Sequence, residues 1–212
     1  LIKDMMNILA HRGRDDSGFI TDKKASLGHN RLTIIDLSEK GHQPMHNEDN
    51  SIFITYNGEI YNFKDIRKIL EEKGHKFYSN TDTEVILHAY EEWGFKCLDK
   101  LNGMFSFVIY DSNKKLLFGA RDRLGQKPLK YYFKNGIFIF ASEIKALLAL
   151  LPDKPEVDEE AIDNFLTLQY VPSPQTGFKN IYKLPAAHYL IYQNNKLSIR
   201  KYWSLDFNKK EN

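Results

Sequence analysis

The change from helical to alternating periodicity is the feature of this chain that most constrains its fold. Apolar residues have helical spacing over residues 63–73 and 81–94, and the period changes to two from Phe105 onward. Turn signals at residues 111–113 and at Asn135-Gly136 predict two hairpins. Helices, then hairpins, then further helices are typical of an α+β fold, in which segregated helices cover antiparallel sheets.

The boundaries of the individual elements follow from the same patterns. Asn62 is a candidate cap for the helix that begins at residue 63. Thr81 and Glu84 have capping-box spacing, and Gly94 suits the exit of that second helix. We predict a first helix that ends near residue 10, helices at 63–73, 81–94, 143–150 and 159–168, and strands at 19–21, 26–29, 52–56, 105–110, 116–120, 131–133, 137–141, 189–192 and 198–203.

Composition narrows the class of protein. The 212 residues are 42% hydrophobic and 13% aromatic, enough for a packed core in one sizeable domain or two small ones. The net charge is +2 and no basic stripe is present, so nucleic acid is not an expected partner. The longest apolar run, residues 146–151, is too short to span a membrane. The single cysteine, Cys97, cannot form an internal disulfide, which fits a reducing cytoplasm.

A polar cluster follows the predicted strand at residues 52–56. There, Asn57, Gly58 and Glu59 place an amide, a backbone without a Cβ and a carboxylate at what we predict to be a strand end. The Asn57 side chain and the Gly58 N–H could both face a developing oxyanion. An ordinary turn is the alternative, because Asn-Gly is a strong hairpin signal.

Three further polar clusters lie at predicted element ends. They are His11-Arg12-Gly13, Arg31 and Asp82. Taken singly, each has a structural explanation. His11 can be a last-turn helix residue, Arg31 can form a surface ion pair of little energy, and Asp82 can be a carboxylate favoured by a helix dipole.

Together and in this order, the clusters resemble the glutaminase domain of asparagine synthetases, which are class II glutamine amidotransferases. The resemblance runs from residue 11 to about residue 203. It rests on the motifs HRGRDDSG (11–18), NRLTIID (30–36), YNGEIYN (56–62), TDTEVILHAYEEWG (81–94), LNGMFSFVIYD (101–111), RDRLGQKPLKYYF (121–133) and ASEIKALL (141–148).

The resemblance implies a fold and a domain division. The implied fold is an Ntn-hydrolase-like, four-layer αββα sandwich of mostly antiparallel sheets. The implied division is an amidotransferase domain at residues 1–203 and a linker at 204–212 that leads to a synthetase domain. The helical spacing begins at the first residue without a cap, so we expect that residues and the family's first strand are missing upstream.

The resemblance also implies how glutamine is bound. Arg31 would hold the α-carboxylate through a planar guanidinium, and Asp82, with Glu59 beside it, would pair with the ammonium. Backbone groups in the segment of Leu32, Ile34 and Ile35 would line the pocket. Asn57 and the Gly58 N–H would form the oxyanion hole.

The family's nucleophile is an N-terminal cysteine whose own α-amine serves as the base. That cysteine would lie before Leu1, and Cys97 has no local group to activate it, so we expect Cys97 to be a buried structural thiol. We therefore predict that the 212-residue chain alone does not hydrolyse glutamine.

The parent protein implied by the resemblance is a glutamine-hydrolysing asparagine synthase. Its ATP, Mg²⁺ and aspartate would belong to a C-terminal synthetase domain, so no cofactor is expected in these residues. No metal is expected either, because the histidines are scattered and lack ligand spacing. A homodimer is compatible with the family. Two alternatives stay open: a glutamine-binding or regulatory module without catalysis, and an amidotransferase with another acceptor, such as a sugar.

Overall fold

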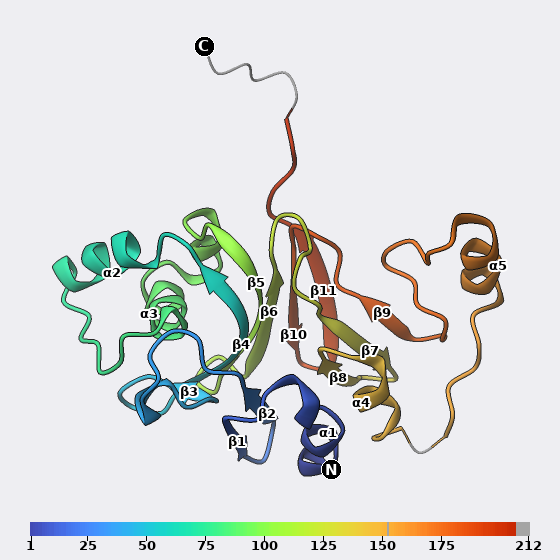
Figure 1. The fold of residues 1–212 in the computed structure, drawn as a ribbon, viewed down its shortest axis with the longest axis horizontal. Helices are drawn as coiled ribbons and strands as arrows, with labels where there is room; N and C mark the ends of the chain where they lie inside the picture. Colours follow the sequence, from blue (N-terminus) through green and yellow to red (C-terminus); the bar gives the residue numbers. More distant parts are fainter. Residues whose placement is uncertain (152, 207–212) are drawn as a thin grey trace.

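The computed structural model describes residues 1–151 and 153–206. Its central layers are antiparallel sheets, and helices cover both outer faces (Figure 1). This four-layer αββα arrangement confirms the predicted α+β class. Every strand pair in the described residues is antiparallel.

The larger sheet has six strands in the order β11-β10-β6-β5-β4-β3. Their bounds are β3 Met45–His46, β4 Ile52–Ile60, β5 Gly103–Asp111, β6 Leu116–Arg121, β10 His188–Gln193 and β11 Lys196–Lys201. Helices α2 (Phe63–Glu72) and α3 (Asp82–Trp93) cover its outer face (Figure 1). The core of this half consists of apolar side chains from these helices, including Leu70 and Ile86, packed on Phe105, Phe107 and Phe118 of the sheet.

The opposite half contains two smaller sheets. One has the order β8-β7-β9, with β7 Lys130–Lys134, β8 Ile137–Ala141 and β9 Ile181–Lys183, and the other is a hairpin of β1 (Asp16–Thr21) and β2 (Ser26–Arg31). Helices α1 (Ile2–Ile8) and α4 (Ile144–Leu148) pack on this half, and α5 (Glu159–Leu168) lies further out (Figure 1). Short 3₁₀ helices occupy Ala10–Arg12, Glu39–Gly41 and Gly94–Asp99.

The larger sheet and the β8-β7-β9 sheet face each other through an apolar layer. Val108 and Leu190 of the first pack with Leu129, Tyr131 and Leu184 of the second half. Many strands therefore bury side chains on both faces, as expected for strands between layers. Within residues 1–151 and 153–206, no helix has the length and hydrophobicity needed to cross a bilayer.

Several predicted details differ from the structure. The first strand is Asp16–Thr21 instead of 19–21, the second extends to Arg31, and the last is Lys196–Lys201 instead of 198–203. Strand β4 does not stop at residue 56 but continues through Asn57, Gly58 and Glu59 to Ile60, because nine consecutive residues pair with β5. This also excludes the Asn-Gly hairpin turn. The side chain of Asn62 makes no capping bond; it donates to the Lys100 carbonyl and accepts from the Asn102 N–H instead. Helix α4 is shorter than predicted and begins after Glu143.

Candidate active site

One cavity of about 760 Å³ brings the predicted site residues together. Among the residues that line it are Arg31, Leu32, Ile34, Ile35, Asn57, Gly58, Glu59 and Asp82. They come from the end of β2, the segment that follows it, the middle of β4 and the start of α3. Arg31 and Asp82 are far apart in the sequence, so only the fold brings them to the same cavity.

Arg31 is buried, with 7% of its surface exposed, and its guanidinium is held by backbone oxygens. It donates to the carbonyls of Ser38 at 3.0 Å, Ile35 at 3.4 Å and Asp36 at 2.5 Å. No carboxylate forms an ion pair with this guanidinium within the described part of the chain. A buried cation without a counter-ion is costly, and an anionic ligand would compensate for that cost.

Asp82 is the opposite case, a buried carboxylate without a cation. Its Oδ2 accepts hydrogen bonds from the Tyr56 hydroxyl at 2.6 Å and from the Ile60 N–H at 2.9 Å. Burial raises the pKa of Asp82, and the nearby Glu59 carboxylate raises it further, although the two hydrogen bonds lower it. Neither Asp82 nor Glu59 pairs with a cation among the residues described. This end of the cavity is therefore suited to a positively charged ligand group.

Asn57 and Gly58 lie on β4, next to the edge strand β3 of the larger sheet. The Nδ2 of Asn57 is buried and has no hydrogen-bond partner in the described structure. An unpaired buried donor costs about 1–3 kcal/mol, which a ligand oxygen would relieve. Gly58 pairs with Phe105, and a Cβ on Gly58 would lie 2.2 Å from the Met104 carbonyl oxygen, so only glycine fits there.

Cys97 and His11 do not line the cavity, whereas Arg12 does. Cys97 is fully buried in the core between the α2/α3 layer and the larger sheet, and this burial raises the pKa of its thiol far above the usual range. It is a structural thiol, as predicted. His11 and Arg12 both contact the Glu143 carboxylate, at 2.9 and 3.0 Å, which joins the chain after α1 to the start of α4.

Sequence reasoning did not single out the residues that hold the two charges in place. Tyr56 binds Asp82 directly. Asp36 connects the two ends of the site, because its carbonyl accepts from Arg31 while its Oδ2 accepts from the Asn80 N–H, two residues before Asp82. Both residues lie inside the quoted motifs, so their place in these motifs was the available signal.

Among the described residues, the group that could hold a metal ion lies away from the cavity. His75, His88 and Glu91 bring their possible ligand atoms within 4.8 Å of one another. Their spacing in the sequence does not indicate such a group.

The profile of the family described as "Glutamine amidotransferase domain" matches residues 1–203. The chain belongs to this family. The match confirms the resemblance predicted from the motifs, and the cavity described above is the candidate active site of a glutamine amidotransferase domain.

Comparison with individual proteins shows which members of the family this amidotransferase domain resembles. It is 42% identical to "Putative asparagine synthetase [glutamine-hydrolyzing] 2" of Methanocaldococcus jannaschii, over 95% of this chain and 42% of that protein. It is also 42% identical to "Asparagine synthetase [glutamine-hydrolyzing] 3" of Bacillus subtilis, over 97% of this chain and 34% of that protein. The chain therefore spans about a third to two fifths of the length of these relatives.

A solved structure supports the fold of the amidotransferase domain. The glutamine phosphoribosylpyrophosphate amidotransferase of B. subtilis superposes with a TM-score of 0.65, over 93% of this chain and 45% of that one. The sequence identity is 18%, so this likeness concerns the fold alone. It confirms the Ntn-hydrolase-like architecture predicted from the motifs.

Proposed function

We propose that this domain binds L-glutamine and hydrolyses its side-chain amide within the intact protein, releasing ammonia for the ATP-dependent conversion of aspartate to asparagine. Arg31 binds the α-carboxylate of glutamine, and Asp82 with Glu59 binds the α-ammonium. The segment of Leu32, Ile34 and Ile35 lines the pocket. Asn57 and the Gly58 N–H stabilise the oxyanion.

The observation that carries this proposal is the presence of two uncompensated buried charges of opposite sign at one cavity. The Arg31 guanidinium is held only by carbonyls, and the Asp82 carboxylate only by a hydroxyl and an N–H. A free amino acid carries the complementary pair of charges on one carbon. The planar guanidinium of arginine can form two parallel hydrogen bonds with a carboxylate, which the ammonium of a lysine does not.

The unpaired donor of Asn57 supports the catalytic part of the proposal. Its Nδ2 is buried beside the cavity and lacks an acceptor in the described structure, as a donor reserved for a transient oxyanion would. Because Asn57 lies within the nine-residue pairing of β4 with β5, this donor is held on a regular strand, which suits a group that must be oriented before the reaction. Losing one such donor typically lowers turnover by about 10²–10³-fold.

The nucleophile in this proposal is the N-terminal cysteine implied by the family, not Cys97. The Cys97 thiol is fully buried in another part of the molecule, and its raised pKa disfavours the reactive thiolate. The 212-residue chain is accordingly expected to bind glutamine without hydrolysing it.

The names of similar proteins support the proposed acceptor of the ammonia. Two of those most similar to this chain are named glutamine-hydrolysing asparagine synthetases, so we propose an accompanying synthetase domain that uses ATP and Mg²⁺. A Penicillium rubens relative, 35% identical over 97% of this chain, is named "Amidase chyE", which keeps a different acceptor as the second candidate. We also propose a cytoplasmic location and leave a homodimer as a possibility to be tested.

Calorimetric titration of the 212-residue chain with L-glutamine tests the binding step. We expect binding by the wild type and by Arg14→Ala, which removes an exposed arginine outside the cavity. We expect Arg31→Ala to lose binding. Equal affinity in Arg31→Ala and the wild type, or no binding by the wild type, would contradict the assignment.

A further inference from the structure

A second polar cluster lies along α3, and its residues His75, His88 and Glu91 do not line the cavity. His88 and Glu91 are three positions apart on α3, and His75 reaches them from the loop between α2 and α3. Their possible metal-ligand atoms all lie within 4.8 Å of one another. His88 is almost completely buried, whereas the side chains of His75 and Glu91 are 18% and 19% exposed.

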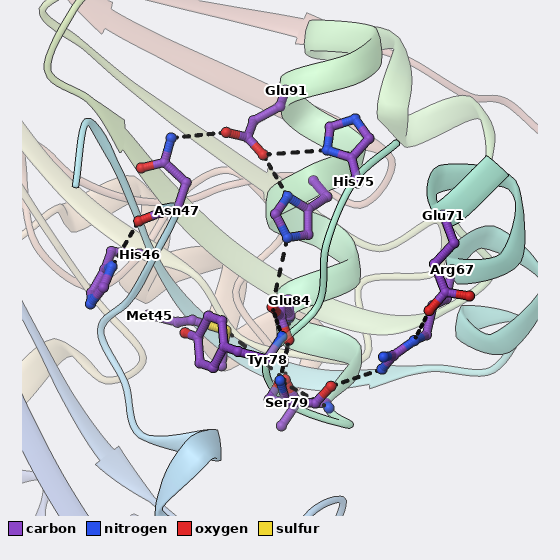
Figure 2. Close-up of polar contacts among 12 residues, drawn as sticks. Met45, His46, Asn47, Arg67, Glu71, His75, Tyr78, Ser79, Glu84 and Glu91 are labelled. Carbon is purple, nitrogen blue, oxygen red and sulfur yellow. Dashed lines mark hydrogen bonds and ion pairs between the residues drawn. The ribbon is translucent and has the colours of Figure 1, made fainter. Parts of the chain in front are cut away.

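The two imidazoles have matching orientations around the Glu91 carboxylate. The Nδ1 atoms of His88 and His75 both face Glu91 Oε2, at 2.6 and 3.8 Å. Figure 2 shows His75 beside Glu91. Their opposite ring nitrogens face other carboxylates: His88 Nε2 lies 3.7 Å from Glu84, and His75 Nε2 lies 3.4 Å from Glu92. Each ring thus lies between the shared Glu91 oxygen and a carboxylate of its own.

This arrangement is typical of metal ligands. A metal-bound histidine commonly donates its other ring N–H to a carboxylate, which fixes the tautomer and the orientation of the ring. His75 Nε2 has such a hydrogen bond, to Glu92, and the Glu84 carboxylate lies 3.7 Å from His88 Nε2. Glu91 is held as well, because its Oε1 accepts a hydrogen bond from Asn47 Nδ2 at 2.8 Å.

The ring of His88 provides an additional observation. Its Nε2 is buried and has no hydrogen-bond partner in the described structure, since Glu84 is too distant for one. Without an ion, a proton on Nδ1 is shared with Glu91. An ion on Nδ1 would leave the remaining proton on Nε2, the atom that faces the Glu84 carboxylate.

We propose that His75, His88 and Glu91 bind a zinc ion through the two Nδ1 atoms and Glu91 Oε2, with water as the fourth ligand. Zinc favours imidazole nitrogen together with carboxylate oxygen, whereas Mg²⁺ and Ca²⁺ favour oxygen ligands. Ligand atoms about 2.0–2.1 Å from a tetrahedral ion lie roughly 3.4 Å apart. The distances from the two Nδ1 atoms to Glu91 Oε2, 2.6 and 3.8 Å, bracket that value.

The ion would connect the loop before α3 to the helix itself. It would therefore act as a structural link, and the inference is independent of the proposed glutamine chemistry. The partial exposure of His75 and Glu91 leaves space for the ion and its water to reach the cluster.

Zinc binding must displace a proton from His88. Burial alone lowers the pKa of His88, but Glu84 and Glu91 raise it to about 9. Because metal-bound imidazole is neutral at the ligating nitrogen, zinc affinity should increase with pH up to that value. The charged or titratable groups around this ring are Glu84 and Glu91 on its own helix, Glu48 after β3, His75 in the preceding loop, and the Lys73–Glu92 pair.

Calorimetric titration of the metal-free 212-residue chain with Zn²⁺, and visible spectroscopy with Co²⁺, test the proposal. We expect one ion per chain and Co²⁺ absorption bands of a four-coordinate site. His75→Ala and Glu91→Gln should each weaken zinc binding by about 100-fold or more, since even outer groups that orient ligands contribute about 10–100-fold. Asn47→Ala should have a smaller effect, about 10-fold.

His46→Ala is the matched control, because His46 lies beside Asn47 but bonds to a backbone carbonyl instead of to the cluster (Figure 2). It should bind zinc as the wild type does. Zinc should raise the melting temperature of the wild type and of His46→Ala but not of His75→Ala. His75→Asn, which keeps a polar side chain of similar length, provides a second test if His75→Ala folds poorly. No binding by the wild type, or equal affinity in the wild type and the His75 and Glu91 variants, would overturn the proposal.

Discussion

Helix α3 contains two groups of buried charges, one around Asp82 and one around His88, and the two differ in whether the charges are compensated. At its beginning, Asp82 is a buried carboxylate that no cation of the described chain neutralises. Further along the same helix, His88 is buried between Glu84 and Glu91, so that charges of opposite sign lie side by side. Residue type alone does not separate the two regions, because both contain buried acids on one helix.

The difference shows how to distinguish a site that needs the charges of an amino-acid ligand from a cluster whose charges already compensate one another in the metal-free chain. Charges that compensate one another lower the cost of their own burial. A charge that is left uncompensated beside a cavity destabilises the empty protein, and the ligand supplies the compensation. The following predictions test this distinction in each group of charges.

The largest expected effect is on stability, in the compensated group of charges around His88. Glu84 is fully buried, accepts bonds from the N–H groups of Tyr78 and Ser79, and faces His88. Glu84→Gln should lower the free energy of unfolding by about 3–5 kcal/mol, because it leaves a buried imidazolium partly uncompensated. Urea denaturation at neutral pH measures this loss. Glu72→Gln, at an exposed glutamate of α2, should change stability little, and an equally stable Glu84→Gln would show that the cluster does not stabilise the fold.

The next effect is the pH dependence of stability without metal. The pKa of His88 is raised from the ordinary value of 6.5 to about 9, so the folded state binds its proton more tightly than the unfolded state does. This contribution is fully present below pH 6.5 and is lost as pH rises through 9; it amounts to about 3 kcal/mol.

Urea titrations from pH 6 to 10 in the presence of a chelator measure that loss. His88→Gln should flatten the profile across this window. An unchanged profile in the variant would mean that another group causes the dependence.

In the uncompensated group, Asp82→Asn should separate binding from stability. Glutamine affinity should fall by about 10–100-fold, because a charged hydrogen bond to the ammonium is lost. The free energy of unfolding should stay constant or rise, since the buried charge is removed while the amide oxygen can still accept from Tyr56 and Ile60. Calorimetry and urea denaturation give the two quantities, and a stability loss that matches the affinity loss would contradict the comparison.

The start of α3 shows which part of the structure could be predicted from the sequence and which part could not. The N-cap of α3 was predictable, because Thr81 accepts from the Glu84 N–H as the spacing indicated. The other half of the capping box is absent: the Glu84 carboxylate binds Tyr78 and Ser79 instead, because the preceding loop folds back over it. Local spacing predicts a helix start, but not which partner a long side chain selects in a packed structure.

Family motifs were the only basis for predicting that residues far apart in the sequence lie at the same site. The shared cavity of Arg31 and Asp82 followed from a resemblance to a family, whereas periodicity contains no information about it. No sequence motif predicts that His75 and His88 contact the same carboxylate, because this proximity depends on the path of the loop between α2 and α3. Similarly, the pairing of β4 with β5 overrides the local turn signal of Asn57 and Gly58.

The smallest expected effect concerns Tyr56. Tyr56→Phe removes the hydroxyl that donates to Asp82 Oδ2 and retains the ring, so glutamine affinity should fall by only about five-fold. The loss of this hydrogen bond should also raise the pKa of Asp82 further. As the pH falls, the carboxylate of the variant should therefore be protonated earlier, and glutamine binding should be lost at a higher pH than in the wild type. Titrations with glutamine between pH 4 and 8 would reveal the shift, and identical pH profiles would show that Tyr56 does not influence the Asp82 charge.

The complete burial of Cys97 has a practical consequence for spectroscopy. The single cysteine of the chain is fully buried and its thiol pKa is strongly raised, so a maleimide dye would react with it only slowly. A cysteine introduced at Leu37, which is 80% exposed next to Asp36, would be labelled selectively. Fluorescence from that position would then report, against a dark native background, whether the segment that holds Arg31 changes its environment when an amino acid is added.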